Sequence, residues 1–246
     1  MQLENAVVLL TGAKRIGAEI AVAVAERGAD VAVVYRGSAD EAEEVGRRVR
    51  ITGRRAVVVQ ADVSDPMACA AVVEAVEREL GRLDVLINMA SLYHHVEFND
   101  LDAAEWTRQL AVDLNGSFFC ALAAVPAMRK RGLGRIINFA DWVVASGRPR
   151  YPGFLAYYVA KAGVKALTEG LALELAADQI LVNAIAPGPI LAPPGTSESE
   201  LQTVIEATPV GRWGGAGEVV KTVLALIDSD FITGETIRVD GGRHLH

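Results

Sequence analysis

The sequence has few cysteines, an excess of acidic over basic residues, and no long apolar run. Its two cysteines, Cys69 and Cys120, are too few for a disulfide framework or a cysteine-based metal cluster. The formal net charge of −7 gives no electrostatic support for binding nucleic acid. No apolar run approaches the ~18 residues that cross a bilayer, and residues 1–5 lack the basic and apolar regions of a signal peptide. We therefore expect a soluble, reduced, cytoplasmic protein with no nucleic-acid or membrane partner.

The sequence also lacks internal repeats, linkers and low-complexity segments, and its composition of 51% hydrophobic and 22% charged residues is typical of a globular protein. Short apolar runs alternate with segments of helical period. Strands are predicted at residues 6–10, 31–35, 56–60, 83–88, 135–140, 180–186 and 236–239. Helices are predicted from Ile16 to a stop at Gly28, at residues 39–53, 66–81, 106–131 and 218–227, and from Tyr157 through Leu175.

Two local features accompany this pattern. Pro126 is expected to distort the helix at residues 106–131, and the polar residues 195–207 are expected to form a mobile flap. The alternation predicts an α/β fold: a single doubly wound Rossmann-type domain over residues 1–246, with a seven-stranded parallel sheet and helices on both faces. Ligands of such sheets bind at the carboxyl ends of the strands. Here those ends carry Gly12, Arg36, Asp62, Asn88, Asp141 and Pro187.

The segment at residues 11–17 joins the first strand to the first helix. Gly12 allows a tight turn and Gly17 allows close packing of the helix on the sheet, while the helix N-terminus offers free N–H groups to a pyrophosphate. In the usual glycine-rich loop a middle glycine lets the backbone approach the pyrophosphate closely. Here Lys14 or Arg15 occupies that position. We therefore expect side chains to help bind a phosphate.

The second strand ends in Tyr35-Arg36-Gly37-Ser38. An NAD site would place a carboxylate there for the ribose 2′-hydroxyl. The planar, charged fork of Arg36 instead suits a 2′-phosphate, so the sequence favours NADP(H) over NAD(H).

Tyr157 and Lys161 lie one helical turn apart and therefore on the same face of the predicted helix. A free phenol titrates near ~10, and a fixed cation beside it is expected to lower its pKa toward working pH. Such a tyrosine can give a proton to a carbonyl or an imine. By itself this pair also fits an ordinary amphipathic helix.

Together the motifs resemble those of the short-chain dehydrogenase/reductase family, in its order and over nearly the whole chain. They are Thr11-Gly12 with Gly17, Asp62-Val63, Asn88-Met89-Ala90-Ser91, Tyr157 with Lys161, Asn183 with Pro187-Gly188, and Asp240-Gly241-Gly242. The resemblance implies a homotetrameric or homodimeric oxidoreductase in which Tyr157 donates a proton and Lys161 binds the nicotinamide ribose. The cofactor-binding residues expected from the motifs and the resemblance are Gly12, Lys14, Arg15, Ile16, Gly17, Tyr35, Arg36, Ser38, Asp62, Val63, Asn88, Ala90, Ser91, Tyr157, Lys161, Pro187, Gly188 and Ile190.

Three departures from the family pattern qualify the resemblance. The phosphate loop is one residue shorter than usual, Asp141 stands at the position of the catalytic serine, and Asp113 stands at that of a helical asparagine, with Asn115 two residues on. Asp141 and the basic phosphate loop resemble pteridine reductases and bacterial dihydromonapterin reductases. That resemblance implies NADPH-dependent reduction of a C=N bond in a pterin ring. We expect Tyr157, Lys161, Asp141 and Asp113 to be catalytic, although Asp141 also fits a loop cap.

The leading hypothesis is therefore an NADPH-dependent reductase of a pterin-like or folate-like substrate. One alternative is a carbonyl reductase of the 3-oxoacyl-thioester or small-ketone type, and another is an NADP-binding protein with little turnover. Tyr93, Trp142, Phe154 and Trp213 either stack a flat ring or pack internally. Arg148 and Arg150 either meet an anionic substrate tail or face solvent, and His94 and His95 lack an evident third ligand, so no metal site is predicted.

Overall fold

The computed structural model describes residues 1–12 and 14–245. In these residues seven parallel strands form one sheet in the order β3-β2-β1-β4-β5-β6-β7. The strands are β1 (Val7–Thr11), β2 (Asp30–Tyr35), β3 (Ala56–Gln60), β4 (Val85–Asn88), β5 (Gly134–Phe139), β6 (Ile180–Pro187) and β7 (Thr236–Val239). The predicted Rossmann-like α/β fold is confirmed, and the strand order reverses between β1 and β4, where such folds bind ligands.

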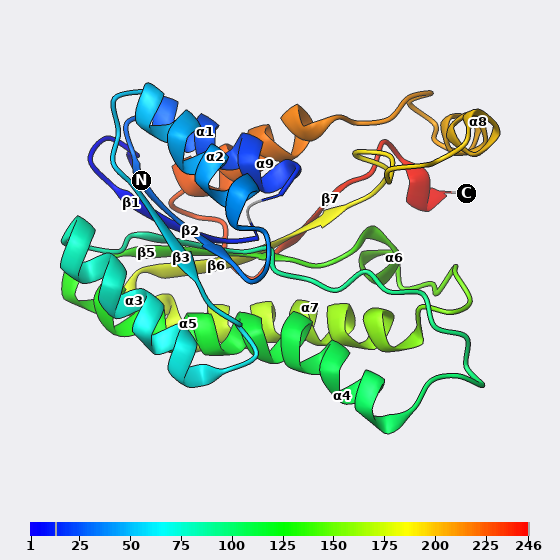
Figure 1. The fold of residues 1–246 in the computed structure, drawn as a ribbon, viewed down its shortest axis with the longest axis horizontal. Helices are drawn as coiled ribbons and strands as arrows, with labels where there is room; N and C mark the ends of the chain where they lie inside the picture. Colours follow the sequence, from blue (N-terminus) through cyan, green and yellow to red (C-terminus); the bar gives the residue numbers. More distant parts are fainter. Residues whose placement is uncertain (13, 246) are drawn as a thin grey trace.

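Helices cover both faces of the sheet (Figure 1). One face carries α1 (Ile16–Glu26), α2 (Ala39–Ile51) and α9 (Ala216–Asp228), and the other carries α3 (Pro66–Leu80), α5 (Gly116–Arg131) and α7 (Leu155–Leu175). Successive strand residues point to opposite faces. In β1, Val8 and Leu10 therefore enter the core under α1, whereas Val7 and Leu9 enter the core under α3 and α5. The central strands are continuously apolar because both of their faces are buried.

The predicted helix at residues 106–131 begins earlier and contains an irregular turn. It comprises α4 (Ala103–Leu110), a π-helical turn η1 (Ala111–Asn115) and α5. The Asp102 carboxylate caps its start by accepting a hydrogen bond from Glu105 N at 2.7 Å. α5 runs through Pro126, so the proline does not end the helix, and the expected local distortion there stays a prediction. Proline lacks an N–H, and here the carbonyl left without that donor belongs to the exposed Leu122.

The same continuous helix, Ala103–Arg131, is long and apolar enough to cross a membrane by length and composition alone, which the sequence analysis did not anticipate. Half of its most apolar stretch is buried within the protein, where α5 packs against α3 and the sheet. This burial is typical of the core helix of a layered α/β fold.

Two further segments differ from the sequence-based expectation. Residues 195–207, which were expected to form a mobile flap, contain the helix α8 (Glu198–Glu206), which the sequence analysis did not predict. It begins with a capping box in which the Ser197 and Glu200 side chains each accept a hydrogen bond from the other residue's backbone N–H. An unpredicted short helix, α6 (Trp142–Ala145), follows β5. Short 3₁₀ turns, η2 (Ala176–Asp178) and η3 (Arg243–Leu245), follow α7 and β7.

Candidate active site

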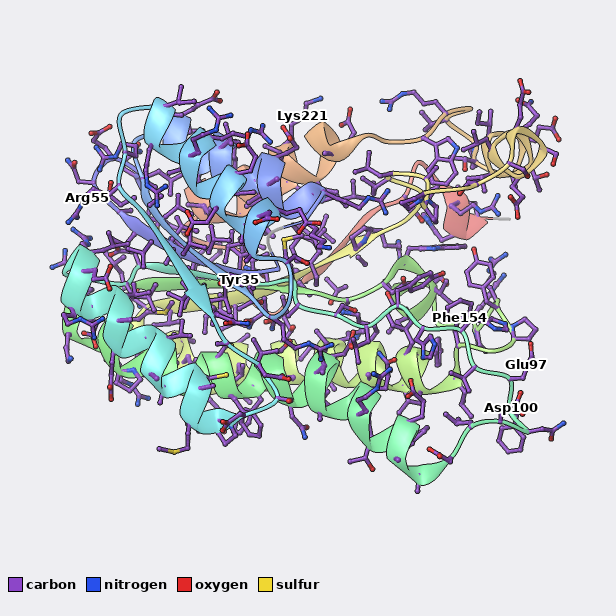
Figure 2. The ribbon with its side chains drawn as sticks, in the orientation of Figure 1. Tyr35, Arg55, Glu97, Asp100, Phe154 and Lys221 are labelled. Carbon is purple, nitrogen blue, oxygen red and sulfur yellow. The ribbon has the colours of Figure 1, made fainter. Side chains whose placement is uncertain are left out.

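A cavity of about 780 Å³ lies beyond the carboxyl ends of the strands around the switch point. Its walls come from the β1–α1 turn, the segments after β4, β5 and β6, and the start of α7. Phe154 lines the cavity, and Arg55 lies just before the start of β3. Figure 2 shows these two residues on opposite sides of the molecule. The residues from the predicted set that line the cavity are Lys14, Arg15, Ile16, Ser91, Asp141, Tyr157, Lys161, Pro187, Gly188 and Ile190.

Tyr157 and Lys161 lie side by side in the lining of this cavity. The Tyr157 hydroxyl donates a hydrogen bond to Asp141 Oδ2 at 3.0 Å. The Lys161 Nζ lies 5.7 Å from the centroid of the Tyr157 ring and donates to the Phe139 carbonyl at 2.9 Å. Its side chain is only 4% exposed, so the position of this ammonium group is fixed by its surroundings.

The pKa of Tyr157 is shifted in the direction opposite to the one expected from the sequence. Burial raises the pKa of Tyr157 well above its ordinary value, and the Asp141 and Asp113 carboxylates raise it further. Lys161 Nζ lies 3.2 Å from the fully buried Asp113 carboxylate, whose negative charge opposes the effect of the ammonium group on the phenol. The hydroxyl therefore stays protonated and available to donate.

Asp141 follows β5 and faces Tyr157. Its Oδ1 accepts from Val143 N at 2.8 Å, which caps α6, while its Oδ2 accepts from Tyr157. Asp141 therefore caps the loop with one carboxylate oxygen and faces Tyr157 in the cavity with the other, so the loop cap does not exclude a role in the site. Burial raises the pKa of Asp141, although the hydrogen bonds from Val143 and Tyr157 and the charge of Lys161 oppose this.

Asp113 lies behind Lys161, on the π-helical turn. It is fully buried and accepts hydrogen bonds from the Ser91 hydroxyl, from Leu92 N at 2.9 Å and from Gln109 Nε2 at 2.8 Å. Asn115 is exposed, so Asp113 is the inward-facing residue of the turn. Gln109 was missed by the sequence analysis, although its spacing of four residues from Asp113 places it on the same helical face.

The β1–α1 turn brings the backbone close enough for a phosphate. A Cβ added at Gly17 would overlap the Gly12 carbonyl oxygen. Gly12 has a φ of 92°, and a Cβ added there would lie 3.2 Å from the Met89 carbonyl carbon. Thr11, which belongs to the recognised motif but not to the predicted site residues, accepts hydrogen bonds at Oγ1 from Met89 N at 3.0 Å and Ala90 N at 3.1 Å. These contacts join the ends of β1 and β4, and such a glycine cradle fits a dinucleotide.

Both cations of this turn line the cavity, and each has a protein partner. Lys14 Nζ is 3.0 Å from Glu41 Oε1 on the surface. Arg15 has a φ of 53° and donates from Nη2 to the Ala192 carbonyl at 2.6 Å. Arg15 thereby links the β1–α1 turn to the segment after β6.

A second group of the predicted cofactor-binding residues follows the ends of β2 and β3. Tyr35, at the end of β2, is labelled in Figure 2. Arg36 Nη1 lies 3.7 Å from Asp62 Oδ2, and both side chains are about half exposed. The Ser64 hydroxyl donates to Asp62 at 2.7 Å and is the main cause of its lowered pKa. Ser38 precedes α2, and Val63 packs against Gly116 at the start of α5. A half-exposed guanidinium at this point is free to meet a phosphate group from solvent.

Other predicted residues lie in structural roles beside the cavity. Asn88 is buried and donates from Nδ2 to Ser117 O at 3.2 Å and to Asn138 Oδ1 at 2.9 Å, which joins β4 to α5 and β5. Its Oδ1 is buried without a hydrogen-bond partner among the described residues. Gly188 N donates to the Val239 carbonyl at 2.9 Å, so the Pro187-Gly188 corner is fixed by the end of β7.

The four predicted aromatic residues all line the cavity. Tyr93 stacks on Phe154 with ring centroids 4.7 Å apart and meets Tyr157 edge-on at 5.1 Å. Trp142 is buried at the start of α6. Tyr93 and Phe154 therefore pack internally beside Tyr157, while a role for the four rings as a surface for substrate stays a prediction.

The two adjacent histidines pair with carboxylates on the surface. His94 Nδ1 is 2.8 Å from Glu105, and His95 Nε2 is 3.2 Å from Glu97. Within residues 1–12 and 14–245, no group of three histidine, cysteine or acidic side chains comes together as a metal site.

A protonated tyrosine and a buried lysine beside a glycine-lined helix start, at the switch point of a parallel sheet, define a dinucleotide-dependent oxidoreductase. A family model described as enoyl-(acyl carrier protein) reductase matches residues 12–244. The chain belongs to the short-chain dehydrogenase/reductase family.

The relatives include a 3-oxoacyl-[acyl-carrier-protein] reductase of Staphylococcus aureus strain Mu50, which is 36% identical and covers 96% of this chain and 97% of its own. A short-chain dehydrogenase/reductase from Serratia marcescens superposes with a TM-score of 0.91 at 30% identity, covering 99% and 100% of the two chains. An NAD⁺-bound xylitol dehydrogenase superposes with a TM-score of 0.90 at 29% identity, covering 98% and 100%. The resemblance to pteridine reductases finds no support among these relatives.

Proposed function

We propose that this protein is an NADPH-dependent carbonyl reductase acting on a 3-oxoacyl thioester or a small ketone. The observation that carries the proposal is the Tyr157 hydroxyl, which lines the cavity, has a raised pKa and lies beside the buried Lys161. The S. aureus relative supports this substrate class by its name. The carbonyl alternative therefore replaces the pterin hypothesis as the leading interpretation.

When bound, NADPH would supply the hydride for the carbonyl carbon. The Tyr157 hydroxyl gives its proton to the carbonyl oxygen, so that a ketone becomes an alcohol and the phenolate is later reprotonated from solvent. Lys161 stabilises the transient phenolate and is positioned to bind the nicotinamide ribose. Asp113 holds the lysine in place through the 3.2 Å ion pair. Gly12, Ile16 and Gly17 would hold the pyrophosphate, and Pro187 and Ile190 would border the nicotinamide.

The direct test adds NADPH and one candidate substrate to the purified protein and follows the loss of NADPH absorbance. Acetoacetyl thioester, a small neutral ketone and dihydrobiopterin are the three arms. Turnover of the thioester or ketone supports the proposal. NADPH binding without turnover of any arm would contradict it and favour a binding protein.

A pterin substrate remains a second candidate because of one contact, the 3.0 Å hydrogen bond between Tyr157 and Asp141. A carboxyl group at this point can accept hydrogen bonds from a pterin ring or help relay a proton to its nitrogen. Replacing Asp141 with serine, the family residue, separates the candidates. The pterin hypothesis expects pterin reduction to fall more than ketone reduction, and an equal change would contradict it.

The choice of NADPH over NADH depends on Arg36. The xylitol dehydrogenase neighbour binds NAD⁺, so the residue at the end of β2 is the feature to test. We predict that Arg36→Gln lowers the NADPH-to-NADH affinity ratio by about 10–100-fold, since a hydrogen bond to a charged group contributes about 1.5–3 kcal/mol. Calorimetry with both cofactors measures this ratio. Arg47→Gln is the control, because Arg47 pairs with Glu44 on the exposed side of α2, and an equal loss in both variants would contradict the assignment.

We also propose a single domain over residues 1–246, working in the cytoplasm as a homotetramer or homodimer. Support for self-association comes from exposed apolar side chains on the outer helices. Leu122 on α5 is 61% exposed and Leu173 on α7 is 82% exposed. Light scattering of the purified protein measures the oligomeric state, and a monomer would contradict the proposal.

A further inference from the structure

Two arginines from distant parts of the sequence approach one tryptophan in the cavity wall. The Cζ of Arg150, which precedes α7, lies 5.5 Å from the centroid of the Trp142 ring, and the Cζ of Arg243, on η3, lies 6.0 Å from it. All three residues line the cavity. An aromatic face holds a guanidinium group in place while leaving its N–H groups available.

Three side chains in the cavity lining each carry a buried hydrogen-bond donor without an acceptor. Arg150 Nε, Arg243 Nη1 and Trp213 Nε1 have no hydrogen-bond partner in the part of the chain that the structure describes. Trp213 also lines the cavity. A buried donor left without an acceptor costs about 1–3 kcal/mol, so Arg150, Arg243 and Trp213 carry hydrogen-bonding capacity that no described protein group satisfies.

The charges around the cavity lead to the same conclusion. Of the residues that the structure describes, its lining holds the cations Lys14, Arg15, Arg150, Lys161 and Arg243 and the single carboxylate Asp141, in a chain with a net charge of −7. Lys14 and Lys161 have carboxylate partners, whereas Arg15 and Arg150 each donate to a backbone carbonyl, that of Ala192 at 2.6 Å and that of His244 at 3.4 Å. Among the described residues no carboxylate forms an ion pair with Arg150 or Arg243. A concave, locally positive wall attracts an anion.

We propose that Arg150, Arg243 and Trp213 form a subsite for an oxyanion at the tail of the substrate, a carboxylate or a phosphate monoester. The proposal rests on the carbonyl-reductase function and specifies its substrate class: an oxo compound whose anionic tail is separated from the reacting carbonyl by a short apolar chain. The carbonyl lies at Tyr157, the chain lies along the Tyr93 and Phe154 rings, and the oxyanion accepts from the two guanidinium groups. Lys14 and Arg15 remain available for the dinucleotide phosphates.

The kinetic test compares oxo acids with their methyl esters at saturating NADPH. Suitable acids are 4-oxopentanoate, 5-oxohexanoate and 6-oxoheptanoate, and a ketone carrying a phosphate monoester forms a separate arm that distinguishes the two oxyanions. For the best chain length we expect kcat/KM of the anion to exceed that of the ester by about 10–100-fold. Arg150→Gln and Arg243→Gln should each bring this ratio toward one, and Arg150→Lys should restore part of it.

Arg148→Gln is the matched control, because Arg148 is exposed and does not belong to the cavity lining. It should keep the wild-type ratio of anion to ester. A wild-type ratio near one for every anion, or an equal fall in the Arg148 variant, would overturn the subsite.

A binding measurement keeps the subsite testable even if no carbonyl compound is reduced. Calorimetry of the NADPH-loaded protein with hexanoate, hexyl phosphate and the neutral hexanamide needs no turnover. We expect an anion to bind at least about tenfold more tightly than the amide, and the Arg150→Gln/Arg243→Gln double variant to lose this preference. Anion binding without ketone reduction would refute the carbonyl-reductase proposal alone. Ketone reduction without any anion preference would refute the subsite alone.

Discussion

The two ends of the cavity are built from different materials. At the end where we propose that the cofactor binds, the β1–α1 turn beside the cavity depends on close backbone contacts, with Gly12 and Gly17 in close approach and Thr11 joining β1 to β4. At the substrate end, side chains form the surface, with Tyr93 stacked on Phe154 and two guanidinium groups near Trp142. The cofactor end therefore tolerates almost no added atom, whereas the substrate end can exchange one side chain for another and change what it binds.

Tyr157 stands between the two ends, and its removal gives the largest expected effect. Tyr157→Phe removes the proton donor and should lower kcat for carbonyl reduction by about 10²–10⁴-fold. NADPH affinity should stay within about twofold, because the cofactor end is made of other atoms. Stopped-flow reduction and calorimetry measure the two quantities. Retained turnover would remove Tyr157 as the acid, and a large loss of NADPH affinity would show that the ends are not separable.

Gly17→Ala tests the backbone end directly. The new Cβ would overlap the Gly12 carbonyl oxygen, so we expect the free energy of unfolding to fall by about 1–3 kcal/mol and NADPH affinity to fall by about tenfold or more. The control is Gly170→Ala on α7, where nothing lies within 4 Å of the added atom. That exchange should raise the free energy of unfolding by up to about 1 kcal/mol. Urea unfolding compares them, and similar values for both variants would contradict the steric argument.

Asp113→Asn tests how firmly Lys161 is held. The four groups around this carboxylate are the Ser91 hydroxyl, Leu92 N, Gln109 Nε2 and Lys161 Nζ, and an amide has one acceptor oxygen where the carboxylate has two. We expect the free energy of unfolding to fall by about 1–3 kcal/mol.

The control for this exchange is Asp228→Asn, because Asp228 forms a half-exposed pair with Arg27. Its cost should stay below about 1 kcal/mol. If the two exchanges cost the same in urea unfolding, the buried network around Asp113 contributes no more than a surface ion pair.

The smallest effect concerns pH at the substrate end. Burial raises the pKa of Asp141 above its ordinary value of 3.8. Its protonated form is therefore favoured by folding, and this contribution to stability is complete below about pH 4 and is lost as the pH rises through the raised pKa. Asp141→Asn keeps a residue type that can cap α6 and should gain stability relative to the wild type as the pH increases from about 4 to 7. Urea unfolding at several pH values measures this trend, and a constant difference would contradict it.

The same exchange should lower the pKa of Tyr157, because the Asp141 carboxylate is one of the groups that raise it. Ultraviolet titration of each protein against its Tyr157→Phe counterpart isolates the phenol. An unchanged pKa would show that burial alone sets the state of the hydroxyl.

The glycine turn after β1 and the meeting of Tyr157 with Lys161 could be predicted from the sequence because both depend on particular residues at short, fixed spacings. Gly12, Gly17 and the pair of Tyr157 and Lys161 belong to local patterns, and the apolar strands made the sheet recognisable. The capping box of Ser197 and Glu200 was equally local, and α8 could have been predicted from it. These features need only neighbours in sequence.

The rest depends on contacts between distant segments. The pKa of Tyr157 was expected to be lowered, but burial raises it, and the Asp141 and Asp113 carboxylates, which come from two distant segments, raise it further. Arg243 gave no local signal, since its meeting with Trp142 requires β7 to be in place. Composition does not reveal a π-helical turn, and spacing does not reveal which arginine reaches which ring.

The placement of tryptophans also has a practical consequence. Of the three in the chain, Trp142 and Trp213 line the cavity, whereas Trp106 lies on α4. The intrinsic emission of the protein is therefore weighted toward the site itself. A ligand bound at either end should change the intensity or the wavelength of this emission without any attached dye. Trp106→Phe would leave a chain whose tryptophan fluorescence comes from the cavity alone.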